Sequence, residues 1–94
     1  MTSASNPWPK LKRDLIAILR GVKPDEVLAI GEALVLAGIE AIEVPLNSPE
    51  PFRSIELLAR NLPSSVLIGA GTVLDAADIA RLSAAGGRLM ISPN

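Results

Sequence analysis

The 94-residue sequence predicts an α/β fold of parallel strands and helices, and more specifically about half of a (β/α)8 TIM barrel. Four short apolar runs alternate with three amphipathic stretches in the order β-α-β-α-β-α-β. Such alternation implies parallel strands joined by right-handed crossovers. Apolar residues make up 49% of the chain and charged residues 20%, so the chain should fold. The compact repeat favours the barrel over a small open α/β sheet, which is the competing architecture.

The first two strands are predicted at residues 15–19 and 39–46, which are aliphatic runs. Between them, Lys23-Pro24-Asp25 begins a stretch with helical spacing, and Gly38 can cap its C-terminal end. After the second strand, Ser48-Pro49 is typical of an N-cap followed by a first helical turn. This second helix would present one apolar face, formed by Phe52, Ile55, Leu58 and Leu62.

The second half of the chain repeats the same unit. Pro63 ends the second helix, and the third strand is predicted at residues 66–70. Asp75 can cap a third helix, which Gly86-Gly87 ends. Residues 88–92 form the fourth predicted strand.

Four units amount to half of a closed barrel. Residues 1–94 are therefore expected to be the N-terminal half of a single barrel domain, with residues 1–13 as a polar N-terminal segment. A half-barrel leaves two parallel edges and one face uncovered, which is unfavourable in water. We expect a longer chain or a partner to close it.

Composition excludes several classes of function. The chain has no Cys and no His, which excludes thiolate nucleophiles, His-dependent triads and metal sites built on these residues. No metal and no cofactor are expected, and acid–base chemistry must use Asp, Glu or Lys. A net charge of -1 gives no basic excess for nucleic acid. No apolar run reaches the roughly 20 residues of a membrane span, and the polar start is unlike a signal peptide, so we expect a cytoplasmic protein.

Polar or conformationally special residues follow each predicted strand. Active sites of barrels and open α/β sheets lie at the C-terminal ends of strands. The four ends here are Arg20-Gly21, Glu43-Val44-Pro45-Leu46-Asn47, Gly69-Ala70-Gly71-Thr72 and Ser92-Pro93-Asn94.

Glu43 is the most informative of these residues because it lies inside an apolar strand. Alternation places Ala41 and Glu43 on one face and Ile42 and Val44 on the other, which can pack on helices. Glu43 would then point into the barrel, where burial would raise its pKa and suit it to acid–base chemistry. A structural ion pair with Arg20, on the neighbouring strand, is the alternative, and spacing alone leaves both open.

The other strand ends also have two interpretations each. The fork of Arg20 suits a carboxylate or phosphate ligand, or else a salt bridge. Gly69-Ala70-Gly71-Thr72 lacks the full fingerprint of a nucleotide site. Its glycines would let the backbone approach a ligand, with Thr72 offering a hydroxyl, or they would simply form a tight strand-to-helix turn. Lys23 is expected to be solvated.

Taken together, the strand ends resemble the first four strands of the 2-keto-3-deoxy-6-phosphogluconate/galactonate aldolase family. The resemblance covers nearly the whole chain from Leu15 onward. It implies a (β/α)8 barrel, usually a homotrimer. It also implies a class I aldolase that cleaves 2-keto-3-deoxy-6-phospho sugar acids to pyruvate and glyceraldehyde 3-phosphate through a lysine Schiff base, without metal.

The resemblance also implies roles for individual residues. Glu43 matches the general acid/base of the family, and Arg20 matches a substrate-binding arginine of the galactonate branch. Thr72 and Pro93 match positions that line the pyruvate end of the pocket.

Two departures indicate the galactonate branch rather than the gluconate branch, which stays the alternative. Asn47 stands where the gluconate branch typically has arginine, and Asn94 stands where it usually has glycine. Asn47, Asn94 and Gly71 are further candidates for the pocket.

The Schiff-base lysine and the phosphate site of the family lie on later strands. Lys10, Lys12 and Lys23 lie in polar settings, and none of them ends a strand. The 94 residues alone are therefore expected to be inactive. Two other classes remain open, namely a different phosphate-binding barrel enzyme, such as an isomerase or synthase, and a non-catalytic half-barrel that dimerises through its open edges.

Overall fold

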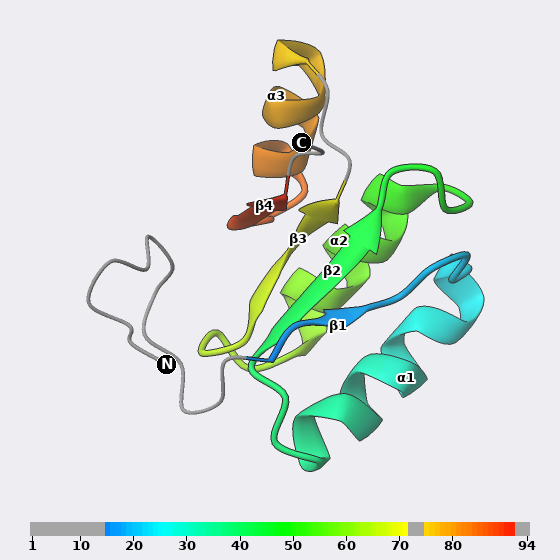
Figure 1. Ribbon diagram of the computed structural model, residues 1–94, viewed down its shortest axis with the longest axis vertical. Coiled ribbons are helices and arrows are strands. Elements are labelled where there is room, and N and C mark those ends of the chain that lie inside the picture. Colours follow the sequence, from blue (N-terminus) through cyan, green and yellow to red (C-terminus); the bar gives the residue numbers. More distant parts are fainter. Residues whose placement is uncertain (1–14, 72–74, 92–94) are drawn as a thin grey trace.

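A computed structural model describes residues 15–71 and 75–91 of the chain. In this part, strands and helices alternate as the sequence predicts (Figure 1). The elements are β1 (Ala17–Ile18), α1 (Pro24–Leu36), β2 (Ala41–Pro45), α2 (Pro51–Asn61), β3 (Leu67–Gly71), α3 (Ala76–Ala84) and β4 (Leu89–Ile91). The polar segment predicted at residues 1–13 lies outside the described residues.

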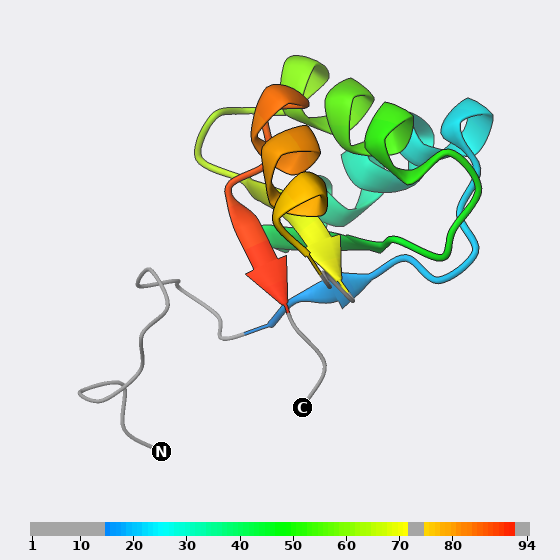
Figure 2. The ribbon, with the colours of Figure 1, turned by 90° about the horizontal axis from the view of Figure 1, so that it is seen from above.

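The strands form one parallel sheet in the sequential order β1-β2-β3-β4. All three helices lie on the same side of this sheet (Figure 2). An open doubly wound sheet would instead carry helices on both faces. Sequential order with helices on one side is the arrangement of consecutive units in a (β/α)8 barrel, so the predicted fold class is confirmed over the open sheet.

The hydrophobic core lies between the sheet and the helices. Its largest fully buried apolar side chains come from both layers, namely Val27 of α1, Ile42 and Val44 of β2, and Ile55 and Leu58 of α2. The predicted apolar face of α2 is therefore confirmed at its centre. The opposite face of the sheet carries Glu43, so β2 divides its side chains between the aliphatic core and an inner face that holds one acid.

Glycine ends two helices, as predicted. Gly38 and Gly86 have positive φ angles of 94° and 91°, a region that side-chain-bearing residues rarely adopt. After α1, the Gly38 N–H donates to Val35 O and the Ile39 N–H donates to Leu34 O, which is a Schellman motif. The third helix begins as predicted too, because Asp75 Oδ1 accepts a 2.9 Å hydrogen bond from the Asp78 N–H.

The predicted start of the second helix is wrong by two residues. The helix begins at Pro51, with Glu50 as its N-cap in the left-handed region at φ 40°. Pro51 at the first helical position loses nothing by having no N–H, since that donor would have no partner inside the helix. Ser48 does not cap the helix. Its side chain is buried, and its N–H donates to Pro45 O in a turn after β2.

The predicted strands also differ at their ends, since β1 and β2 are each three residues shorter than predicted. Of residues 15–19, only Ala17–Ile18 pair with β2 as a strand, although the Leu19 N–H still donates to Glu43 O at 3.0 Å. Because β1 lies at the edge of the sheet, one neighbour alone defines its length. Strand β3 extends one residue further than predicted, so it includes Gly71.

The core predicts a clear contrast between two leucines. We expect Leu58→Ala to destabilise the full-length protein by about 2–5 kcal/mol, because it leaves a cavity between α2 and the sheet. Leu36→Ala removes the same atoms from a side chain that is 89% exposed, so it should cost less than about 0.5 kcal/mol. Urea unfolding of both variants measures the difference, and equal losses would contradict this description of the core.

Candidate active site

Glu43 lies on the inner face of the sheet, opposite the helices, as alternation along β2 predicts. Its side chain is only 4% exposed, although it is an acid in the middle of a strand. Its chain neighbours Ile42 and Val44 belong to the core on the other face. The inward orientation predicted from the sequence is therefore confirmed.

The carboxyl group of Glu43 leans toward the C-terminal end of the neighbouring strand. In the register of the sheet, Glu43 pairs with Gly69, whereas Gly71 pairs with Pro45. Yet a Cβ atom at Gly71 would overlap Glu43 Oε2 and Cδ, and it would lie 2.9 Å from Oε1. The carboxyl group therefore lies against the bare backbone of Gly71, at the C-terminal ends of the strands, where active sites of this fold class lie.

The two glycines of β3 are required for space and not for a turn. Both belong to the strand, Gly71 as its last residue, and neither has a positive φ. A Cβ at Gly69 would overlap the backbone carbonyl of Leu89 on β4, and one at Gly71 would overlap Glu43. The tight-turn interpretation of these two residues is thus wrong. They make room for neighbours within the protein itself.

Burial and charge act on Glu43 in opposite directions. Desolvation raises the pKa of the carboxyl group above its ordinary value of 4.5, and the positive charge of Arg20 lowers that pKa by a smaller amount. Within the described part of the chain, the ion pairs join Glu56 to Arg53 and Arg60, and none joins Glu43 to Arg20. The alternative of a structural ion pair between Glu43 and Arg20 is therefore not supported.

The structure places three further predicted site residues at the same C-terminal ends of the strands as Glu43. Arg20 follows β1 and is exposed, and it acts on Glu43 by its charge. Gly71 is buried against the Glu43 carboxyl group. Asn47 is exposed in the turn that follows β2.

The three remaining predicted site residues are Thr72, Pro93 and Asn94, and they lie outside the described residues.

Sequence reasoning missed two features, one at the end of β2 and one in the turn that follows it. Ser48 is buried in the turn after β2, and its Oγ has no hydrogen-bond partner among the residues that the structure describes. Pro45 is buried on the same face as Glu43. Alternation along β2 could have identified Pro45. The sequence alone could not have shown that Ser48 precedes the helix, because Pro51 is acceptable in the first turn of a helix that starts at either proline.

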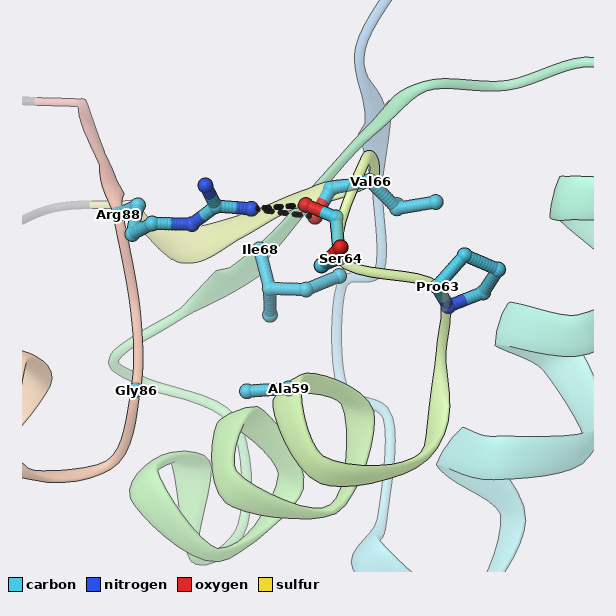
Figure 3. Close-up of a pocket in the computed structure, with 7 residues that line it drawn as sticks. All are labelled: Ala59, Pro63, Ser64, Val66, Ile68, Gly86 and Arg88. Atoms are coloured by element: carbon cyan, nitrogen blue, oxygen red, sulfur yellow. Dashed lines mark hydrogen bonds between the residues drawn. The ribbon is translucent and has the colours of Figure 1, made fainter.

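A separate hollow lies at the opposite, N-terminal ends of β3 and β4 (Figure 3). The Arg88 guanidinium reaches across it and donates hydrogen bonds to the carbonyls of Ser64, at 2.5 Å, and Val66, at 3.3 Å. These bonds join the N-terminal end of β4 to the loop before β3. The arginine is therefore a structural link, and the hollow is not part of the site around Glu43.

The described residues contain no group of three or more side chains suited to hold a metal ion. In the same residues, no helix is both long and apolar enough to cross a membrane.

Comparison with known proteins gives consistent matches. The family model for KDPG and KHG aldolase matches residues 10–94. A probable 2-dehydro-3-deoxy-6-phosphogalactonate aldolase of Rhizobium meliloti (strain 1021) is 57% identical over 88 residues, which are 94% of this chain and 42% of that protein. The chain thus spans less than half of this relative.

Two solved structures are similar as well. A native KDPGal structure superposes with a TM-score of 0.86 at 45% identity, over 93% of this chain and 42% of that one. KDPG aldolase of Legionella pneumophila, with pyruvate captured at low pH as a covalent carbinolamine intermediate, gives a TM-score of 0.76 at 37% identity. That match covers 83% of this chain and 37% of the other.

The raised pKa of Glu43 predicts how stability depends on pH. Above its folded pKa the buried carboxylate costs stability, and below about pH 4.5 the group is protonated in both states and the cost is absent. Glu43→Gln should therefore gain stability relative to wild type as pH rises through the folded pKa. Urea unfolding across pH measures this, with Glu32→Gln on the exposed surface of α1 as the control for loss of a charge. A difference that stays constant with pH would contradict the burial of the charge.

Proposed function

Because this chain belongs to the KDPG and KHG aldolase family, we propose that the protein containing it cleaves 2-dehydro-3-deoxy-6-phosphogalactonate to pyruvate and glyceraldehyde 3-phosphate. The observation that carries the proposal is the buried Glu43 carboxyl group at the C-terminal edge of a parallel sheet. Residues 1–94 would supply the N-terminal half of one barrel domain.

The choice of the galactonate sugar is supported by similarity and by two residues. Identity is 57% to the relative named for the galactonate substrate and 37% to the KDPG aldolase of L. pneumophila. Asn47 and Asn94 also depart from the pattern of the gluconate branch, which stays the alternative.

The proposed chemistry begins with a lysine supplied from outside these 94 residues. Its neutral amine adds to the C2 carbonyl of the substrate, and the carbinolamine loses water to give an iminium ion. The C4 hydroxyl then loses its proton and the C3–C4 bond breaks, which releases the aldehyde and leaves its electron pair in the enamine of pyruvate. Protonation at C3 and hydrolysis release pyruvate and restore the lysine.

Glu43 is proposed to carry the protons of this cycle. A general acid/base works best when its pKa lies near the working pH, and burial moves the pKa of Glu43 upward from its ordinary value. The carboxyl group can then donate a proton as water leaves the carbinolamine, and it can accept one from the C4 hydroxyl. Its place on the inner face, away from the helices, directs it toward the barrel centre where the iminium would form.

Arg20 is proposed to bind an anionic end of the substrate. Its guanidinium is exposed at the end of β1, beside Glu43 but in no ion pair with it, so its donors stay available for a carboxylate or phosphate. Thr72 and Pro93 would line the pyruvate end. Gly71, Asn47 and Asn94 would complete this half of the pocket.

On the family resemblance, the protein is also proposed to be a cytoplasmic homotrimer that uses no metal or other cofactor. Light scattering on the purified full-length protein measures its mass in solution. A monomer or dimer would contradict the trimer.

Reductive trapping tests the proposed intermediate. Incubation of the full-length protein with pyruvate and borohydride should give a covalent species heavier by one reduced pyruvate, because only an iminium is reduced in this way. Intact-mass spectrometry measures it, and borohydride alone is the control. An unmodified full-length protein would count against the aldolase and favour another barrel enzyme or a non-catalytic scaffold.

The role of Glu43 predicts a kinetic effect. Glu43→Gln should lower kcat for cleavage by roughly 100-fold, since the amide keeps the shape of the side chain but cannot exchange protons. Release of pyruvate, coupled to lactate dehydrogenase, measures the rate. Glu32→Gln is the matched control and should cleave substrate at the wild-type rate. Near-normal turnover by the Glu43 variant would contradict the assigned role.

A further inference from the structure

Strand β3 has no side chains on its inner face at two successive inward positions, Gly69 and Gly71. The two positions make room for different neighbours. Gly69 admits the backbone of β4 at Leu89, whereas all three atoms nearest to a Cβ at Gly71 belong to the carboxyl group of Glu43. The space at Gly71 is therefore filled by a single functional group.

We propose that Gly71 is a positioning residue whose bare backbone sets the place of the Glu43 carboxyl group in the active site. The inference rests on the proposed function, because it assigns to Gly71 a part in the acid–base step. Gly71 itself transfers no proton. It acts by leaving open the space in which the carboxyl group lies.

The contact between Glu43 and Gly71 is diagonal across the two strands, and it therefore places the carboxyl group toward the C-terminal ends of the strands. Glu43 pairs with Gly69 in the register, but its carboxyl group lies over Gly71, two residues nearer to the C-terminal edge. A side chain at Gly71 would close this position and turn the carboxyl group away from the edge at which the substrate would bind. The Glu43 side chain must therefore extend toward the end of β3, and the absence of a side chain at Gly71 leaves room for it.

The size of the effect follows from the overlap. A Cβ at Gly71 would lie 2.9 Å from Glu43 Oε1 and closer still to Oε2 and Cδ. To regain an ordinary contact of about 3.5 Å, the carboxyl group must move by about 1 Å or more. A misplacement of about 1 Å at a reacting group can cost about 100-fold in rate. Because the displaced atoms end a flexible side chain, the fold itself should tolerate the change.

Gly69 provides the structural contrast. A Cβ there would overlap the carbonyl oxygen and carbon of Leu89, which are backbone atoms of the adjacent strand and cannot rotate away. Gly69→Ala should therefore weaken the pairing of β3 with β4 and lower the unfolding temperature. Gly71→Ala should leave the unfolding temperature unchanged and lower kcat.

The deciding experiment is a double-mutant cycle in the full-length protein, with Gly71→Ala, Glu43→Gln and the two combined. Gly71→Ala alone should lower kcat by about 10- to 100-fold, with a smaller change in KM and with circular dichroism like that of wild type. Glutamine has the size of glutamate, so any general damage from the added methyl group persists in the double variant. If Gly71 acts only through Glu43, the double variant should be no slower than Glu43→Gln alone, because the group being positioned has already lost its function.

Each other outcome overturns the inference. Wild-type kcat in Gly71→Ala would show that the carboxyl group does not depend on the bare backbone. If Gly71→Ala lowered kcat in the Glu43→Gln background by the same factor as in wild type, Gly71 would act through the fold and not through Glu43. Failure of the proposed function is distinguishable from both, because wild-type protein would then form no reducible pyruvate adduct and cleave no substrate.

Discussion

The contact between the Glu43 carboxyl group and the bare backbone of Gly71 is the constraint on which the arrangement of the inner face depends. It requires β2 and β3 to be adjacent and parallel, in a register that places Gly71 two residues beyond the partner of Glu43. It also requires that β3 carry no side chain at this position. A strand in the middle of a barrel would ordinarily help to fill the interior with branched side chains. Here β3 leaves that space to an acid.

This constraint is supported by the opposite face of the same strands. Ile42 and Val44 are fully buried against the helices, so β2 cannot slip by one residue without exchanging its aliphatic and polar faces. The packing of β2 on the helices therefore fixes the orientation of Glu43 toward the opposite face. Sequence pattern, strand register and core packing therefore all direct the Glu43 side chain inward. Its position is fixed by Ile42 and Val44, whose own role is packing.

Much of this could be predicted from the sequence because it depends on local patterns. Alternation along residues 41–45 predicts the orientation of Glu43, and Gly38 marks the end of α1 by its positive φ. The start of α2 could not be placed in the same way, because Ser48-Pro49 and Glu50-Pro51 are both acceptable helix starts and the buried turn at Ser48 decides between them.

The role of the glycines in β3 could not be predicted for a different reason. A glycine that permits a turn and one that makes room for a neighbour look the same in a sequence. The neighbour of Gly71 is 28 residues away along the chain, so only the tertiary contact distinguishes the two. That contact also bears on function. A buried acid without an ion-pair partner among the described residues costs stability, so stability alone does not explain its presence. Burial raises its pKa and the charge of Arg20 opposes the rise by a smaller amount, and a raised pKa suits the proposed role of a group that gives and takes protons in one cycle.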